Sequence, residues 1–145
     1  MSFVFDTLEL YWLLHLAQPV FLFFLCKAPT GMENGQIRDA QITASSENDE
    51  NHAAVQGRLN FKAGRSKTGA WSAYGNLVNQ WLQVDLGRYS IVTGIATQGR
   101  NAYPQWVTLY ELQCSEDGVT FVYYKAPGQS SPKNQVSTVF RAKLY

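Results

Sequence analysis

The chain has 145 residues, a length that fits one domain with a core of moderate size. Its formal net charge is +1 and its basic residues form no stripe, which argues against binding of nucleic acid or of an anionic membrane by charge alone. Aromatic residues make up 14% of the chain, and they serve both as core filler in β-proteins and as contact residues in binding sites.

The most hydrophobic stretch of the sequence runs from Leu8 to Cys26. It has the apolar run of a secretory signal sequence, but Asp6 and Glu9 stand where a signal carries basic residues. It is also slightly short for a membrane span, which needs about 20 apolar residues. Three interpretations stay open: a poor or uncleaved signal sequence, a short membrane anchor, or a segment joined to the chain by an error of gene modelling. In each of them residues 1–26 are a leader, foreign to a globular domain that spans residues 27–145.

After the leader, short apolar alternations are separated by turn residues. Residues 41–46, QITASS, indicate a short strand. In the polar segment 47–57 the apolar residues follow neither the strand nor the helix period, which indicates a loop or at most one helical turn. The following segment 58–76 mixes Gly, Ser and aromatic residues and is expected to be irregular. Its residues expected to point inward are Leu59, Phe61 and Trp71.

The clearest strand signal is QWLQVDLG, residues 80–87, in which Leu82, Val84 and Leu86 share one face. A second strand, rich in β-branched residues, is expected at 90–99. Residues 107–124 indicate a hairpin whose turn is SEDG, and the last strand is expected at 136–145. Many short strands without helical periodicity predict an all-β sandwich or jelly roll.

The pair of expected strands in residues 79–100 has no nucleophile with its base, no paired carboxylates and no metal-ligand cluster, so no catalytic chemistry is visible there and we expect no enzyme. Cys114 lies inside an expected strand, which favours a buried and unreactive thiol. Asp85 lies on the face of the clearest strand opposite Leu82, Val84 and Leu86, and it is interpreted as a fold determinant. It is expected to accept hydrogen bonds from nearby backbone or from Arg58.

Several blocks of the sequence match one family in order and spacing. The blocks GMENGQIRDAQITASS, RLNF, AW, QWLQVDLG, VTGIATQGR and YELQCSEDGVTF resemble the discoidin domain, also called the coagulation factor 5/8 type C domain. The resemblance runs from Cys26 to about Phe140. It implies an eight-stranded antiparallel β-barrel of the jelly-roll, galactose-binding-like type, with ligand loops at one end. It also implies an extracellular module, secreted or at the cell surface, which binds glycans, phospholipid head groups, collagen or other proteins in adhesion.

The chain departs from the family at its ends. Family domains usually begin and end with cysteines that pair, and Cys26 matches the first of them. The chain stops at Tyr145, before the second cysteine, so the domain is expected to lack its C-terminal strands. A substitute bond from Cys26 to Cys114 is not expected, because Cys114 falls within a strand that is expected to belong to the core.

The ligand loops of the family map onto residues 47–56 and 100–106 of this chain. The side chains there that suit a sugar, with aromatic faces and planar donors and acceptors, are Asn51, His52, Arg100, Asn101, Tyr103 and Trp106. Simpler interpretations stay open: Trp106 packs at the barrel rim, His52 is an ordinary loop histidine, and Arg100 pairs with Asp49 or Glu50.

No cofactor is expected, although the acids Glu47, Asp49 and Glu50 leave a structural calcium ion as a weak alternative. The first ligand loop has only Ala53, Ala54 and Val55 as apolar residues, which is too little to anchor a domain in lipid. We therefore expect a module for cell adhesion that recognises a cell-surface glycan or an extracellular protein, with no nucleic-acid partner. The alternatives are a phospholipid-binding module of the coagulation type and a carbohydrate-binding module detached from a larger protein.

Overall fold

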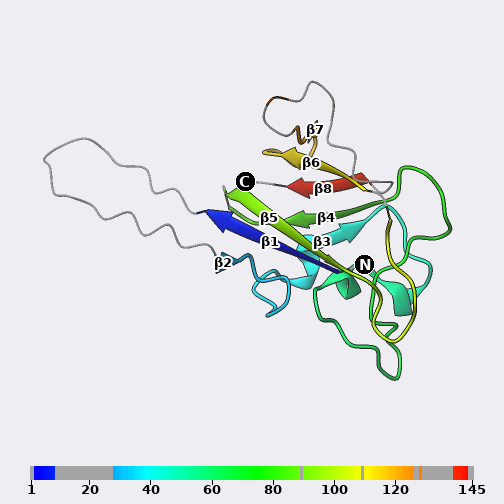
Figure 1. Cartoon of the computed structure of the whole chain (residues 1–145). Helices are drawn as coiled ribbons and strands as arrows, with labels where there is room; N and C mark the ends of the chain where they lie inside the picture. The colour runs from blue at the N-terminus through cyan, green and yellow to red at the C-terminus, as the bar shows by residue number, and fades with distance from the viewer. Residues whose placement is uncertain are drawn as a thin grey trace, which may run out of the picture.

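The strands of the protein form two sheets in the computed structural model, which describes residues 2–8, 28–88, 90–108, 110–125, 128 and 139–143 (Figure 1). The three-stranded sheet has the order β2-β1-β5, with bounds Ala28–Pro29, Ser2–Leu8 and Ile91–Gln98. The five-stranded sheet has the order β3-β4-β8-β6-β7, with bounds Ile42–Ala44, Trp81–Asp85, Val139–Lys143, Glu111–Ser115 and Val122–Tyr123. Short 3-10 helices lie between the strands: η1 Asp39–Gln41, η2 Glu50–His52 and η3 Ala54–Gly57.

The predicted all-β class is confirmed, but the purely antiparallel arrangement is not. β8 pairs in parallel with both β4 and β6, with Val139 opposite Trp81 on one side and Glu111 on the other. The stretch 116–138 between β6 and β8 exceeds the roughly dozen residues that a parallel connection needs. By entering between β4 and β6, β8 pairs backbone groups that would otherwise lie on two open sheet edges. The described strands thus form two sheets rather than one antiparallel barrel.

β1 lies within the segment that the sequence assigned to a leader. Ser2–Leu8 pairs antiparallel with β5 along its whole length, from Ser2 opposite Gln98 to Leu8 opposite Ile91. The stretch SFVFDTL is rich in aromatic and β-branched residues, which favour a strand. The start of the expected leader is therefore part of the sheet. The rest of the hydrophobic stretch, residues 9–27, lies outside the described residues.

The core forms around the inner face of β4. Leu82, Val84 and Leu86 are buried, as their alternation predicted. They belong to one cluster with residues from the first half of the domain, and Val92 and Ile95 of β5 pack against it. The other members of the cluster are Met32, Ile37, Ile42, Ala54 and Trp71.

Of the residues expected to point inward, Trp71 is buried, and its Nε1 donates a hydrogen bond to Ser46 O at 2.9 Å. Leu59 and Phe61 are half-buried. The expectation that Asp85 accepts from nearby backbone is confirmed, because its Oδ1 accepts a hydrogen bond from Gly87 N at 2.8 Å. Arg58 is engaged elsewhere: its guanidinium donates to Met32 O and Ile37 O and pairs with Asp39.

The predicted hairpin is confirmed as the antiparallel pair β6–β7, in which Gln113 lies opposite Tyr123. Asp117 organises its turn, because its Oδ1 accepts hydrogen bonds from the backbone N of Val119 at 2.8 Å and of Thr120 at 2.7 Å. Cys114 of β6 is a free cysteine of intermediate exposure, so the substitute disulfide is absent. Burial raises the pKa of the Cys114 thiol. Its low reactivity stays a prediction.

Candidate functional site

Four loops gather at the end of the molecule where β3 ends, β4 begins and β5 ends (Figure 1). They are residues 47–57, 62–72, 73–80 and 99–106, and we call this region the loop end. β3 and β4 run antiparallel, with Ala44 opposite Leu82, so the chain leaves one strand and enters the other at the same edge of the sheet. The loop end therefore combines both predicted ligand loops with two segments that the sequence did not assign to the site.

The first loop is held by its own acidic residues. Asp49 Oδ1 accepts a hydrogen bond from Asn51 N at 2.8 Å and lies 2.7 Å from His52 Nδ1. The hydrogen bond with His52 is the main reason that the pKa of Asp49 lies below its ordinary value. Glu47 Oε1 accepts from Ala54 N at 2.7 Å. These carboxylates accept hydrogen bonds from the backbone of η2 and η3. Among the described residues there is no group of three His, Cys, Asp or Glu that could hold a metal ion.

Thr68 joins the first loop to the last one. Its backbone N donates to Gln56 Oε1 at 2.8 Å, and its Oγ1 donates to Asn51 O at 2.7 Å. On the other side, Arg100 Nε donates to Thr68 O at 3.0 Å. The predicted residues Asn51 and Arg100 are thus brought to a common partner that the sequence did not single out.

The loop 62–72 also lies close against the backbone of the loop 99–106. Asn101 Oδ1 accepts a hydrogen bond from Ala63 N at 3.0 Å, and Gly69 lies against Asn101. Gly69 has a φ of +82°, and a Cβ at this position would lie 2.8 Å from Asn101 Cβ. Glycine is therefore required here both for its left-handed backbone and for lack of space.

The last loop displays aromatic side chains. Arg100 Cζ lies 4.7 Å from the centroid of the Tyr103 ring, within the range of a cation–π interaction, and its NH1 donates to Gln105 Oε1 at 2.6 Å. These contacts replace the predicted alternative of a pair between Arg100 and a neighbouring acid. Tyr103 is exposed, and Trp106 is 67% exposed, so the interpretation of Trp106 as a packing residue of the barrel rim is wrong.

The six predicted ligand residues therefore take different roles in the geometry. The side chains of Tyr103 and Trp106 face solvent. The side chains of Arg100 and Asn101 are engaged with neighbouring loops, and His52 is engaged with Asp49. Asn51 takes part through its backbone, whose N donates to Asp49 Oδ1 and whose O accepts from Thr68 Oγ1.

Sequence reasoning missed the most apolar segment of the loop end. Tyr74, Leu77 and Val78 are all exposed on the loop 73–80. The base of this loop is fixed, since Tyr74 N donates to Ser46 Oγ at 3.0 Å. The signal that could have found it is YGNLVNQ, in which large apolar residues alternate with Gly and Asn and follow neither the helical nor the strand period.

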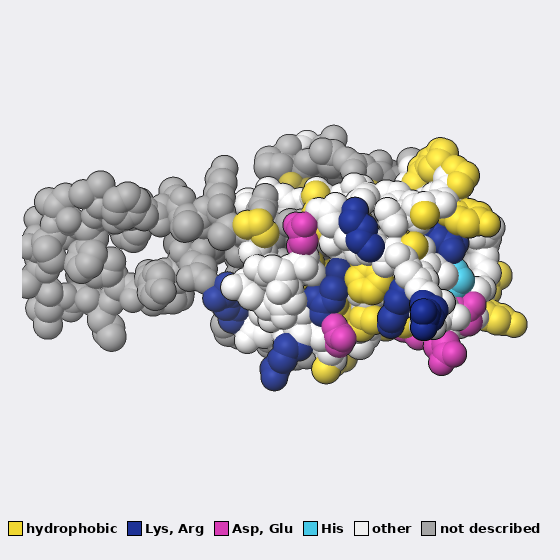
Figure 2. Space-filling view, turned by 90° about the horizontal axis from the view of Figure 1, so that it is seen from below, with side chains coloured by type: hydrophobic (Ala, Val, Ile, Leu, Met, Phe, Trp, Pro, Cys, Tyr) yellow, Lys and Arg dark blue, Asp and Glu magenta, His cyan; other side chains and the backbone are white. Residues whose placement is uncertain are grey.

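The loop end also carries basic residues. Lys62, Arg65 and Lys67 are exposed on the loop 62–72. Figure 2 shows hydrophobic side chains protruding at the right-hand end of the molecule, with Lys and Arg side chains beside them. A surface that mixes exposed apolar groups with cations suits a partner that is apolar inside and anionic outside, such as a phospholipid surface.

Comparison with known proteins places this architecture in a family. The model of the F5/8 type C domain matches residues 41–143. The chain is 39% identical to lactadherin of Rattus norvegicus over 110 residues, which cover 72% of the chain and 26% of that protein. It is 38% identical to coagulation factor V of Mus musculus over 112 residues, covering 69% of the chain and 5% of that protein. It is 31% identical to neuropilin-1 of Homo sapiens over 132 residues, covering 83% of the chain and 14% of that protein.

The chain spans about a quarter of the length of the lactadherins that it matches. The match covers β3, β4, β5, β6, β7 and β8, and with them all four loops of the loop end. On this evidence the chain belongs to the F5/8 type C, or discoidin, domain family.

Proposed function

We propose that the chain is an extracellular binding module without catalytic activity, which serves cell adhesion by attaching to a cell surface through the loop end. The observation that carries the proposal is the display of five large, exposed apolar side chains on two loops of the loop end. They are Tyr74, Leu77, Val78, Tyr103 and Trp106. Family membership supports the general role, because the resemblance to discoidin domains implies recognition by loops at one end of the fold.

A phospholipid surface is the ligand that this geometry favours. Full burial of a Val or Leu side chain yields about 1.5–3 kcal/mol, so partial insertion of several such groups yields enough to hold a domain on a membrane. Tyr and Trp have an apolar body and a polar tip, which suits the depth of the lipid head groups. Lys62, Arg65 and Lys67 add about 1 kcal/mol each near an anionic surface.

The expectation of a polar ligand rested on the weakly apolar first loop. That loop is indeed unsuited to insertion, because Ala54 is buried and Ala53 and Val55 are half-buried. The loop 73–80 supplies the apolar residues instead. We therefore place the phospholipid surface first among the candidate ligands.

A glycan or protein ligand is the second candidate, and the arrangement of the last loop favours it. Tyr103 offers an aromatic face next to the guanidinium of Arg100, whose position is fixed by Thr68 and Gln105. An aromatic face with fixed donors is what a sugar ring needs. A carbohydrate-binding module of a larger protein would use the same residues.

Vesicle sedimentation of the full chain tests the proposal. The vesicles contain phosphatidylcholine alone or with phosphatidylserine. Val78→Asp introduces a charge at a position that is 83% exposed in the loop end, and Val119→Asp does so at a position that is 82% exposed in the turn after β6. β6 and β4 run in the same direction as β8, so Val119 lies at the opposite end of the sheet from Val78.

We expect the full chain to bind vesicles that contain phosphatidylserine. Val78→Asp should weaken binding by about tenfold or more, as the loss of one inserted side chain requires, while Val119→Asp should leave it unchanged. Equal binding of the two variants would overturn the loop end as the membrane contact. Absence of vesicle binding, together with saturable binding on a glycan array that Tyr103→Ala abolishes, would establish the second candidate instead.

A further inference from the structure

The tip of the loop 62–72 is a narrow, exposed hairpin. Gly64 and Lys67 form an isolated antiparallel bridge, in which Gly64 N donates to Lys67 O at 2.9 Å and Lys67 N donates to Gly64 O at 3.3 Å. Arg65 and Ser66 form the turn between them, and every residue from Lys62 to Lys67 is exposed. The tip is therefore accessible to another macromolecule.

This hairpin is weakly closed. Two-residue turns that match the twist of paired strands need a positive φ at one or both central residues. Neither Arg65 nor Ser66 has a positive φ, and the pairing consists of a single isolated bridge. Since no residue of the tip is buried, opening the bridge exposes little further apolar surface and requires little free energy.

The chain on both sides of the hairpin is held in place. Before the tip, Ala63 N donates to Asn101 Oδ1 at 3.0 Å. After the tip, Thr68 N donates to Gln56 Oε1 at 2.8 Å, and Thr68 O accepts from Arg100 Nε at 3.0 Å. The tip can therefore open while the rest of the loop stays attached to its neighbours.

The chemistry of the tip suits a serine protease of the trypsin class. Such a protease binds an arginine side chain of its substrate in a pocket that has a carboxylate at its base. Among the residues that the structure describes, none forms a hydrogen bond or an ion pair with the guanidinium of Arg65. The neighbours Gly64 and Ser66 are small, and the sequence has no Asp or Glu from Asn51 to Val84 that would repel such a pocket.

Three other arginines are held by the fold. The guanidinium of Arg58 donates to two backbone carbonyls, and that of Arg100 donates to a backbone carbonyl of the loop 62–72. Arg141 lies within β8, whose backbone pairs with a strand on either side. A protease could cut after any of these residues only once the contacts or the sheet had been broken.

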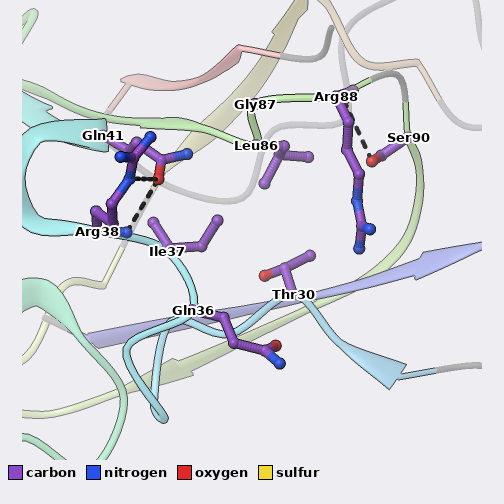
Figure 3. Close-up of a pocket in the computed structure, with 9 residues that line it drawn as sticks. All are labelled: Thr30, Gln36, Ile37, Arg38, Gln41, Leu86, Gly87, Arg88 and Ser90. Carbon is purple, nitrogen blue, oxygen red and sulfur yellow. Dashed lines mark hydrogen bonds between the residues drawn. The ribbon is translucent and has the colours of Figure 1, made fainter.

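The remaining two arginines line a pocket at the opposite end of the fold (Figure 3). Gln41 Oε1 accepts hydrogen bonds from Arg38 N at 3.0 Å and from Arg38 Nε at 3.4 Å, as the dashed lines in Figure 3 show. The acid Asp39 follows Arg38 directly, and Arg88 has an interaction partner as well. Arg65 is thus the arginine that this fold presents for recognition.

A cut between Arg65 and Ser66 would divide the chain without dividing the fold. β1 and β3 lie before this bond, and they pair with β5 and β4, which lie after it. The core cluster also combines Met32 and Ile42 from the first piece with Leu82 from the second. The two pieces therefore share one core and two sheets.

We propose that the Arg65–Ser66 peptide bond is a processing site, at which a serine protease of the trypsin class cuts the folded module once. The protease adds one water molecule across the C–N bond, which leaves a carboxylate on Arg65 and an amine on Ser66. Since the tip belongs to the loop end, a membrane bound there covers this bond, a consequence that rests on the proposed function. The protease then cuts the free module and spares the attached one.

Digestion of the full chain with an arginine-specific serine protease under native conditions, followed by mass spectrometry of the intact products, tests the site. We expect the pieces 1–65 and 66–145, which should elute together in size-exclusion chromatography. Arg65→Gln should slow the loss of intact chain by about tenfold or more, because the protease pocket loses its charged partner. Arg38→Gln, at another exposed arginine, should leave the rate unchanged. Equal rates for the parent and Arg65→Gln, or simultaneous cuts at several arginines, would overturn the site.

Ser66→Pro tests the bond while keeping the charge of Arg65. Proline has no backbone N–H and its ring crowds the cleft of the protease, so the bond that precedes it should resist hydrolysis. We expect this variant to be as resistant as Arg65→Gln. Loss of the intact variant at the rate of the parent would show that the cut falls at another bond.

Vesicles distinguish failure of this site from failure of the proposed function. Where phosphatidylserine vesicles sediment about 90% of the chain, cleavage after Arg65 should slow by about tenfold, because only the free fraction is cut. Phosphatidylcholine vesicles serve as the control and should not slow it. A chain that sediments with vesicles but is cut at the rate of the free chain would overturn the covering of the tip. Cleavage after Arg65 in a chain that binds no vesicles would refute the phospholipid contact and leave the processing site intact.

Discussion

Gln56 Oε1 accepts a hydrogen bond from the backbone N of Thr68 at 2.8 Å, and this contact fastens the loop 62–72 to the first ligand loop. Gln56 is fully buried, and the same oxygen also accepts from Gly69 N at 3.3 Å. Thr68 O in turn accepts a hydrogen bond from Arg100 Nε of the last loop. A buried amide therefore holds three loops in place before any ligand arrives, which lowers the entropic cost of binding.

Gln56→Leu should destabilise the protein and loosen the loop end. The substitution keeps most of the side-chain volume but leaves the backbone N–H groups of Thr68 and Gly69 without this acceptor, at a cost of about 1–3 kcal/mol for a buried donor. Urea unfolding of the full chain measures the change. Gln36→Leu, at an exposed position, serves as the control and should alter the free energy of unfolding by less than about 0.5 kcal/mol. Equal effects of the two substitutions would contradict this role of Gln56.

Gly69→Ala should cost more stability than Gly35→Ala. The two glycines have nearly the same φ, +82° and +81°. Placing alanine in this left-handed backbone conformation should therefore destabilise the protein by a similar amount, about 1–2 kcal/mol, at both positions. Only at Gly69 does the new Cβ also meet Asn101 Cβ at 2.8 Å and Ala63 N at 3.1 Å, whereas nothing lies within 4 Å at Gly35. We expect a further loss of about 1 kcal/mol or more from this crowding. Thermal unfolding of both variants measures it, and a smaller effect at Gly69 would argue against the close approach of the two loops.

Asp117 should make the stability of the β6–β7 hairpin sensitive to acid. Hydrogen bonds from the backbone N of Thr120 and of Val119 hold the pKa of Asp117 below the ordinary value of 3.8. A group whose pKa is lowered in the folded state adds stability above its unfolded pKa and loses that contribution as the pH falls through the folded pKa. The contribution is therefore complete at neutral pH, begins to decline at about pH 4 and is lost as the pH falls further, through the lowered pKa of the folded state.

Asp117→Asn removes this titration. Relative to the variant, the parent chain should lose more of its free energy of unfolding between pH 5 and pH 2, as urea titrations at several pH values can measure. Glu116→Gln removes an adjacent exposed carboxylate and should keep the acid dependence of the parent. Identical acid dependence of the parent and of Asp117→Asn would contradict the prediction.

The strands were predictable where local pattern decides the structure. Leu82, Val84 and Leu86 alternate with polar residues, and a period of two that places apolar groups on one side is sufficient to define β4. The turn at Asp117 was equally predictable, because its side chain satisfies the turn backbone locally. β8 shows the limit of this reasoning. Its place between β4 and β6, and its parallel direction, depend on pairing across long stretches of chain that no local pattern encodes.

The candidate site was predictable only in part, for a similar reason. The segments 47–56 and 100–106 were correctly predicted to be loops because they follow strands. The partners of Arg100 are Thr68, Gln105 and Tyr103 rather than a nearby acid. Apolar residues in irregular segments were also ambiguous. Trp71 is buried and Leu77 is exposed, although both stand among Gly, Ser and Asn residues. Which of them faces solvent is set by tertiary packing, not by the residues next to them.

Quenching of the Trp106 fluorescence by vesicles that contain phosphatidylserine with brominated acyl chains tests whether the loop end enters the membrane. Trp106 is 67% exposed at the loop end, whereas Trp71 is buried in the core. We expect strong quenching for the full chain and loss of most of this quenching in Trp106→Phe, which should still sediment with the vesicles. Quenching that is unchanged in Trp106→Phe, or absent from a chain that binds the vesicles, would show that Trp106 does not enter the membrane and would contradict insertion of the last loop.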